Sequence, residues 1–158
     1  PEDEQSHITD IHFEGYSEGA DYAQVPGGGT DIPWYVKTDK DEYHGFRMDG
    51  MGLYSIGARY GTAFLERLRE GLTEDLGTIK LIVPHQPGKH ALRSMRIQLG
   101  IEEDKFSIVF DRLGNCGAAS MPLALYEAVS TGRLVRVDET LLLGMGAGVS
   151  FGGMILHY

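Results

Sequence analysis

The sequence is poor in several features that define large classes of proteins. Cys116 is the single cysteine among 158 residues, so no disulfide can form within the chain, as is usual in a reducing compartment. Lysine and arginine number 14 against 23 aspartates and glutamates, and the formal net charge of -9 argues against a nucleic-acid partner. The longest apolar stretch, residues 141–156, is too short and too rich in glycine to cross a membrane as a helix. We therefore expect a cytoplasmic protein that binds neither nucleic acid nor membrane.

Two further signals are missing. The start, Pro1-Glu2-Asp3-Glu4, is acidic and polar, unlike a secretory signal, and a start at proline indicates a processed or truncated chain. The triple glycine at 27–29 is not followed by Gly-Lys-Ser/Thr, which favours a flexible turn over a phosphate-binding loop. What is present is an ordinary globular composition, with 42% hydrophobic and 23% charged residues. The length suits one domain, residues 1–158, with one core.

Hydrophobic periodicity predicts alternating strands and helices. Strands are expected at 8–14, 79–83, 106–110, 140–143 and 150–157. Helices are expected at 51–70, from the turn after residue 88 to Gly100, and at 120–131 with Ser120 as N-cap. The first helix carries a core stripe of Leu53, Ile56, Tyr60, Phe64 and Leu68. Residues 15–50, dense in glycine and proline, form a long loop that is functional or lies against a partner.

This order, β-α-β-α-β-α-β-β, predicts an α/β fold with a five-stranded mixed sheet, mostly parallel, and helices packed on it. A glycine-rich corner at 144–148 should join the last two strands as a hairpin, so the last strand should be antiparallel. Functional groups gather at the carboxyl ends of parallel strands. His85, Asn115 and residues 146–148 should therefore meet at one edge of the sheet.

Two of these residues can act together on one oxygen atom. A neutral histidine and an asparagine amide both donate hydrogen bonds, and two such donors stabilise a carbonyl oxygen on which negative charge develops. The alternative is structural: Asn115 closes a turn and His85 is a satisfied surface histidine. We assign no chemistry to the remaining histidines, which are His7, His12, His44, His90 and His157.

Three ordered boxes carry a family resemblance. They are Pro84-His85-Gln86, then Arg112-Leu113-Gly114-Asn115-Cys116-Gly117-Ala118-Ala119-Ser120-Met121-Pro122, then Gly146-Ala147-Gly148-Val149-Ser150-Phe151-Gly152. They resemble the His-Gln-Ala-Asn, Gly-Asn-Thr-Ser-Ala-Ala-Ser-x-Pro and closing glycine-rich boxes of the ketoacyl-ACP synthase III family (ACP, acyl carrier protein). The resemblance is strongest over residues 79–158. It implies the C-terminal half of a thiolase-like condensing enzyme.

The resemblance also implies roles and partners. His85 and Asn115 match the histidine and asparagine that assist decarboxylation of malonyl-ACP and stabilise the enolate, while a cysteine in the missing N-terminal half takes the acyl group from acyl-CoA. A backbone amide of Gly146 or Ala147 would serve the thioester oxyanion hole. The acyl carrier protein would dock near three basic residues, Lys89, Arg93 and Arg96. The full enzyme is expected to be a homodimer without a metal or other cofactor, and this half alone is expected to be inactive.

Departures from the family pattern leave alternatives open. Pro87 and Gly88 replace alanine and asparagine, and His90 replaces a common arginine, which puts the malonyl-ACP substrate in question. Met145 replaces a phenylalanine as a packing change. Cys116 stands beside Asn115, where a Cys-His-Asn triad is conceivable but a small buried residue is expected.

Two other functions remain open: a non-catalytic partner subunit of the same fold, and an enzyme that transfers acyl groups to oxygen or nitrogen. A lone half should also expose apolar residues, with Leu123, Leu125 and Val129 of the third helix expected among them.

Overall fold

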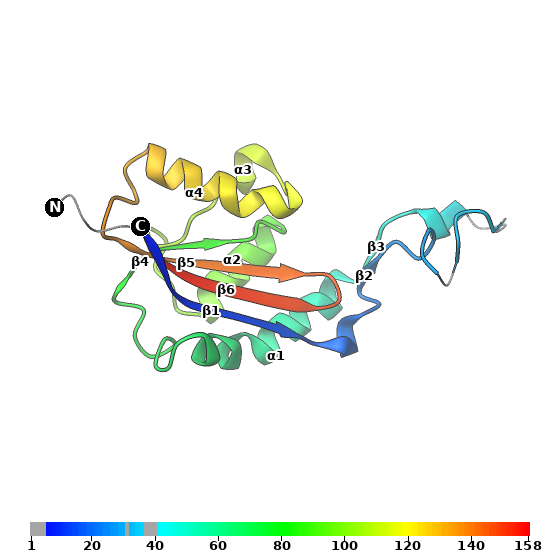
Figure 1. Cartoon of the computed structure of the whole chain (residues 1–158), viewed down its shortest axis with the longest axis horizontal. Coiled ribbons are helices and arrows are strands. Elements are labelled where there is room, and N and C mark those ends of the chain that lie inside the picture. Colours follow the sequence, from blue (N-terminus) through cyan, green and yellow to red (C-terminus); the bar gives the residue numbers. More distant parts are fainter. Residues whose placement is uncertain (1–5, 31, 37–40) are drawn as a thin grey trace.

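The computed structural model describes residues 6–30, 32–36 and 41–158, so the acidic start and parts of the expected 15–50 loop lie outside the described residues. Its main sheet has four strands in the order β1-β6-β5-β4 (Figure 1). The bounds of the strands are β1 His7–Gly15, β4 Ile79–Pro84, β5 Glu139–Gly146 and β6 Ser150–His157. The bounds of the helices are α1 Gly50–Leu68, α2 Lys89–Gln98, α3 Phe110–Leu113 and α4 Ser120–Ser130. The α/β class and the long helices agree with the sequence pattern.

The sheet is less parallel than expected. Strands β4 and β5 run parallel, but β6 is antiparallel to both β5 and β1. The hairpin between β5 and β6 was predicted correctly, although β5 continues through Gly146 and leaves a shorter corner. The parallel pair is the part that positions the candidate site, because its strands end side by side.

The strand expected at 106–110 is wrong. Phe106 forms an isolated parallel bridge with Ile82, and the chain then leaves the sheet edge and enters α3 at Phe110. The apolar run was therefore correct about burial only in part, since Phe106 and Val109 are 2% exposed but Ile108 is 37% exposed, and it was wrong about backbone pairing.

The described part of the 15–50 region has short regular elements. Two-residue strands β2 (Ala23–Gln24) and β3 (Arg47–Met48) pair with each other. Figure 1 shows β2 and β3, with the described residues between them, extending away from the main sheet. No helix in the described ranges combines the length and apolar character needed to cross a bilayer.

Helix α1 covers one face of the sheet and α4 the other (Figure 1). Asp49 caps α1, since its Oδ1 accepts a hydrogen bond of 2.9 Å from the Gly52 N–H. The predicted stripe is the packing face: Ile56, Phe64 and Leu68 are buried, in one cluster with Leu92 of α2. Burial of this face, rather than helix propensity alone, fixes α1 on the sheet.

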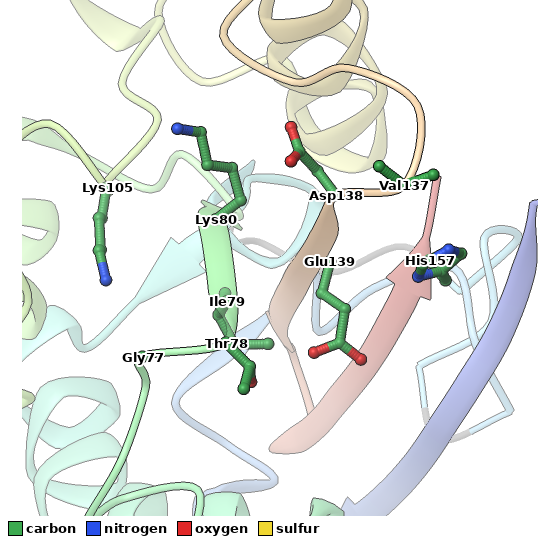
Figure 2. Close-up of a pocket in the computed structure, with 9 residues that line it drawn as sticks. All are labelled: Gly77, Thr78, Ile79, Lys80, Lys105, Val137, Asp138, Glu139 and His157. Carbon is green, nitrogen blue, oxygen red and sulfur yellow. The ribbon is translucent and has the colours of Figure 1, made fainter.

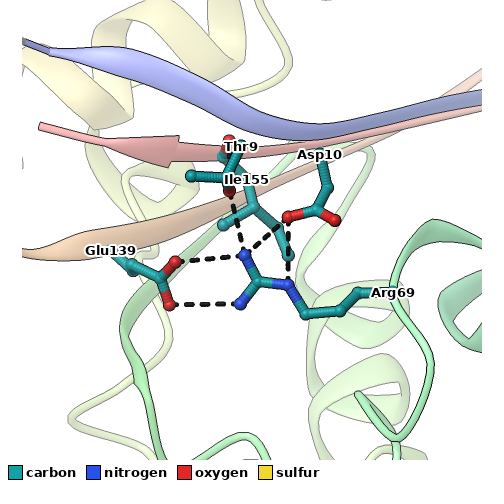
Figure 3. Close-up of polar contacts among 5 residues, drawn as sticks. All are labelled: Thr9, Asp10, Arg69, Glu139 and Ile155. Atoms are coloured by element: carbon teal, nitrogen blue, oxygen red, sulfur yellow. Dashed lines mark hydrogen bonds and ion pairs between the residues drawn. The ribbon is translucent and has the colours of Figure 1, made fainter.

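Arg69, which directly follows α1, connects the end of this helix to two strands through hydrogen bonds and ion pairs (Figure 3). Its Nε donates to the Asp10 carboxylate of β1 at 3.0 Å, and its Nη2 donates to Glu139 of β5 at 3.0 Å. Nη2 also donates to the Thr9 hydroxyl at 2.9 Å. These bonds lower the pKa of both carboxyl groups. The charged network therefore adds to the pairing of β1 with β6 in holding β1 at the sheet edge.

Strand β1 turns its polar side toward α1 and its apolar side outward. Asp10 pairs with Ile155, whose side chain is buried under α1, so both lie on that face. Ile11 and Phe13 alternate with the polar residues and are 53% and 69% exposed on the α4 side of the sheet. Since α4 packs on β4 and β5, this outer apolar strip of β1 stays uncovered in the described residues.

The apolar exposure expected of α4 is found in part. Leu123 is 37% exposed. Leu125 and Val129 instead pack, partly buried, against the cluster that joins α4 to β4, so the expectation for these two was wrong. Their side chains fall on the same face as the buried Ala124 and Ala128, which the helical period allows.

Candidate active site

His85 directly follows β4 at the carboxyl end of the parallel pair. Its backbone N–H donates to the carbonyl oxygen of Leu143 in β5 at 2.7 Å. His85 is therefore placed one residue from the glycine-rich end of β5, Gly144 to Gly146. This is the edge of the sheet that the sequence pattern predicted for it.

The His85 imidazole is half-buried. Burial lowers its pKa, because the charged form loses hydration, and a hydrogen bond with the backbone of Gly117 opposes this shift. With a pKa below its ordinary value of 6.5, the ring is mostly neutral at pH 7. A neutral imidazole carries a single N–H, so this N–H can donate to a substrate oxygen in place of its contact with the backbone of Gly117.

Asn115 lies in the exposed loop between α3 and α4. Its Oδ1 accepts a hydrogen bond of 2.9 Å from the N–H of Gly117. Gly117 has a φ of 57°, a left-handed conformation that favours glycine. Since the backbone of Gly117 contacts both side chains, the structure brings His85 and Asn115 together. The turn uses the oxygen of the Asn115 amide, and its Nδ2 group is the part that can donate to a ligand.

Ser120 holds this loop in a way that differs from the predicted cap. It is the first residue of α4, after the N-cap Ala119, and makes no side-chain cap to the helix. Its buried hydroxyl instead accepts a 3.1 Å hydrogen bond from the N–H of Cys116. The loop that carries Asn115 is thereby fixed to the start of α4.

Cys116 is exposed, so the expectation of a small buried residue was wrong. The loop 115–119 is exposed as a whole, because no other described segment packs over it. The thiol donates to the carbonyl oxygen of Leu113 at 3.3 Å. This contact turns the sulfur toward α3 and gives no support to a Cys-His-Asn triad.

Gly146 and Ala147 stand at the end of β5 and the start of the turn to β6, where both are exposed. Gly146 pairs with Ser150 across the hairpin. Gly144, two residues earlier, lies close to α4: a Cβ there would be 3.3 Å from the terminal methyl of Met121. The hairpin end therefore belongs to the same edge as His85.

The three basic residues expected to dock a carrier protein differ in their surroundings. Lys89 forms an exposed ion pair with Asp111 at 2.9 Å. Arg96 donates to the Ile101 carbonyl at 3.1 Å and is largely covered at the end of α2. Arg93 is exposed on the same helix. Arg93 and Lys89 thus remain accessible to a partner, whereas Arg96 has a structural role.

Sequence reasoning missed Gln86, which is fully buried and makes four hydrogen bonds beside the site. The available signal was its place in the Pro84-His85-Gln86 box, directly after the histidine.

A separate hollow lies away from this edge of the sheet. It encloses about 570 Å³ at the opposite end of the parallel strands, where β4 and β5 begin (Figure 2). Its lining mixes Lys80 and Lys105 with Asp138 and Glu139, and Glu139 is already bound by Arg69. The His85 edge is the better candidate for an active site, because neutral donors that converge at the carboxyl ends of strands can act on one substrate oxygen. The hollow, by contrast, is open and its charges are mixed.

Comparison with known proteins gives a consistent result. Residues 70–158 match the family model described as 3-oxoacyl-acyl-carrier-protein synthase III C terminal. Beta-ketoacyl-acyl-carrier-protein synthase III of Desulfitobacterium hafniense is 32% identical over 153 residues, which cover 92% of this chain and 46% of that protein. The enzyme of the same name from Syntrophomonas wolfei is 29% identical, with 89% of this chain and 42% of the relative covered.

Solved structures show the same fold. The crystal structure of 3-oxoacyl-acyl-carrier-protein synthase III from Aquifex aeolicus matches all of this chain and 46% of its own, with a TM-score of 0.80 at 23% identity. The structure of the synthase III from Thermus thermophilus matches 96% of this chain and 46% of its own, with a TM-score of 0.78 at 27% identity. The chain thus spans about half the length of the relatives it matches.

Proposed function

Because the chain belongs to the family of 3-oxoacyl-acyl-carrier-protein synthase III C-terminal domains, we propose that it supplies the decarboxylation and enolate-stabilising half of a condensing active site. The observation that carries this proposal is the meeting of His85 and Asn115 at Gly117. Both groups are neutral hydrogen-bond donors, as a developing enolate oxygen requires.

The proposed chemistry joins an acyl thioester to a malonyl thioester. The carbon–carbon bond to the malonyl carboxylate breaks and carbon dioxide leaves. The electron pair of that bond passes into the thioester to form an enolate. His85 and Asn115 donate to the enolate oxygen and lower the barrier to its formation. The enolate carbon then attacks the carbonyl of the acyl-cysteine, and the cysteine thiolate leaves. A backbone amide of Gly146 or Ala147 is proposed to serve the oxyanion of that second step.

The cysteine belongs, in this proposal, to a preceding half of the same enzyme. Two features support such a half: the chain covers 42–46% of the two synthases of Syntrophomonas and Desulfitobacterium, and the Ile11–Phe13 side of the sheet is apolar and exposed. Uncovered apolar surface of this kind usually marks an interface. The isolated chain is then inactive. The complete cytoplasmic enzyme, by likeness to its family, is a homodimer that takes acyl-CoA and malonyl-ACP, with the carrier protein near Lys89 and Arg93.

The test is to express the full-length protein and follow two steps separately: transfer of a labelled acyl group from acyl-CoA to the enzyme, and release of carbon dioxide from malonyl-ACP. The proposal requires both steps and a cysteine at a strand-to-helix turn in the preceding half. A full-length protein without that cysteine and without turnover would instead be a non-catalytic subunit of this fold. If turnover instead requires an alcohol or an amine, the enzyme transfers its acyl group to oxygen or nitrogen.

A further inference from the structure

Pro84 interrupts the hydrogen-bond ladder at the outer edge of β4. Just before it, the N–H of Ile82 donates to the Lys105 carbonyl at 2.7 Å, and the Ile82 carbonyl accepts from the N–H of Ser107 at 2.8 Å. An evenly spaced parallel ladder would continue with a bond from the N–H of residue 84 to the Ser107 carbonyl. Proline has no N–H, so this bond cannot form and the backbone ladder stops.

The side chain of Gln86 makes the bonds that the ladder lacks. Its Nε2 donates to the carbonyl oxygens of Ser107 at 3.1 Å and Pro84 at 3.0 Å. Its Oε1 accepts from the N–H groups of Val109 and Phe110, each at 3.1 Å. The side chain is 0% exposed, and both ends of its amide are fully engaged. A rotated amide would oppose its oxygen to two carbonyls, so these contacts fix a single orientation.

These four bonds join the two halves of the candidate site. Gln86 directly follows His85 along the chain, while Val109 and Phe110 begin the short helix α3 that leads into Asn115. The loop that carries His85 and the loop that carries Asn115 are therefore tied to each other through one amide. We propose that Gln86 is a positioning residue that sets the spacing of His85 and Asn115 for action on one oxygen. This inference rests on the function proposed for that pair.

The substitution Gln86→Met, made in the full-length enzyme, tests the proposal. Methionine nearly preserves the length of the side chain but removes all four hydrogen bonds. A displacement of a catalytic group by about 1 Å can slow a reaction about 100-fold. We expect the kcat for decarboxylation of malonyl-ACP to fall by that amount, about 100-fold. Self-acylation of the cysteine, which does not use the pair, should keep its rate.

Two further variants separate positioning from general loss of stability. Gln86→Glu keeps the size of the side chain but turns a carboxyl oxygen toward the carbonyls of Pro84 and Ser107, so decarboxylation should fall at least as far as in Gln86→Met, about 100-fold. Thr140→Val is the matched control. Thr140 is also fully buried, and its Oγ1 donates to the Leu81 carbonyl of β4 at 2.9 Å, away from both loops. This control should lower the Tm without changing decarboxylation.

Hydrogen exchange gives a readout that does not depend on activity. Exchange of the peptide 107–117 should rise in Gln86→Met and stay unchanged in Thr140→Val. The inference is overturned if this exchange is unchanged, or if Gln86→Met slows both half-reactions equally or slows neither. His85→Ala, measured in parallel, keeps the two hypotheses apart. Normal decarboxylation by His85→Ala would refute the proposed function, whereas a slow His85→Ala beside a normal Gln86→Met would refute only the role of Gln86.

Discussion

The N–H of His85 donates to the carbonyl oxygen of Leu143 at 2.7 Å, so the bonding between β4 and β5 continues past Pro84. Pro84 has no N–H to donate on the outer side of β4, but on the inner side the His85 N–H carries the pairing with β5 one residue further. The backbone of His85 is thereby held by the sheet itself, while its ring contacts the 115–117 loop at the backbone of Gly117. Sites built on strand ends are more precise than sites carried by loops alone.

Removing either donor should separate the two half-reactions. In the full-length enzyme, His85→Ala and Asn115→Ala should each slow decarboxylation on the order of 100-fold, the usual cost of losing an oxyanion donor. Self-acylation should change little, because its oxyanion is proposed to use backbone amides. The double variant should lose less than the product of the single effects, since both donors serve one oxygen. Labelled acyl transfer and carbon dioxide release measure the two steps.

The alternative for Asn115 is a purely structural turn. In that case Asn115→Ala would lower the Tm and slow both steps together, because the bond to the Gly117 N–H would be lost. The Tm of each variant, recorded beside its kinetics, distinguishes these outcomes.

His85 should titrate below its ordinary pKa of 6.5, because burial of the ring disfavours the imidazolium more than the Gly117 contact favours it. An NMR titration of the imidazole C–H signals, assigned with a His85→Gln variant, measures this value. The lowered pKa also makes the free energy of unfolding depend on pH, because the ring takes up a proton less readily in the folded state than in the unfolded state. The stability contributed by the neutral ring is complete above pH 6.5 and is lost as the pH falls through the lowered pKa. A value at or above 6.5 would contradict the neutral-donor role.

The location of the candidate site was largely predictable from the sequence. The hydrogen bonds that hold its two loops were not. The α1 stripe from Ile56 to Leu68 and the strand end at Pro84 follow from local pattern, which placed His85 correctly. The segment 106–110 was misread because burial and strand pairing leave the same apolar pattern. Its true partner is the side chain of Gln86, and no local rule specifies a bond between residues 23 positions apart. The exposure of Cys116 likewise depends on which segments pack over its loop.

The sequence pattern also did not predict that the apolar side chains of β1 point away from α1. The weak pattern of 8–14 predicted a strand, and the apolar face of a strand ordinarily points to the core. Here Asp10 and Glu14 face α1 instead, where Arg69 and Arg67 bind them, and Ile11 and Phe13 face away. Arg67 in the last turn of α1 and Arg69 at its C-cap thus stabilise this orientation of the strand.

Arg69→Gln should destabilise the protein at neutral pH and much less in acid. Asp10 and Glu139 would lose their ion-pair partner while about three-quarters covered, at a cost of about 2 kcal/mol in the free energy of unfolding. Their folded pKa values are lowered, so this stability is present above the unfolded values, about 4, and is lost as the pH falls through the lowered ones. Urea unfolding at pH 7 and pH 3 measures the difference between parent and variant.

The exposed pair Arg59–Glu18 supplies the control for that experiment. Its side chains are 65% and 44% exposed, so Arg59→Gln should leave the free energy of unfolding nearly unchanged at both pH values. A pH-independent loss in Arg69→Gln would mean that the packing of the arginine stem, rather than its ion pairs, stabilises the fold.

Two glycine substitutions should change stability in opposite directions. At Gly153 in β6, a Cβ would lie 2.8 Å from Leu68 Cδ2 and 3.0 Å from Phe64 Cε1, closer than carbon atoms normally approach. Gly153→Ala should therefore push α1 from the sheet and cost about 1–3 kcal/mol, as overpacking does. At Gly61 in α1 a Cβ would meet nothing within 4 Å, so Gly61→Ala should gain up to about 1 kcal/mol from helix propensity. Thermal unfolding of both variants measures the pair. A stabilising Gly153→Ala would show that α1 packs more loosely on β6 than these distances imply.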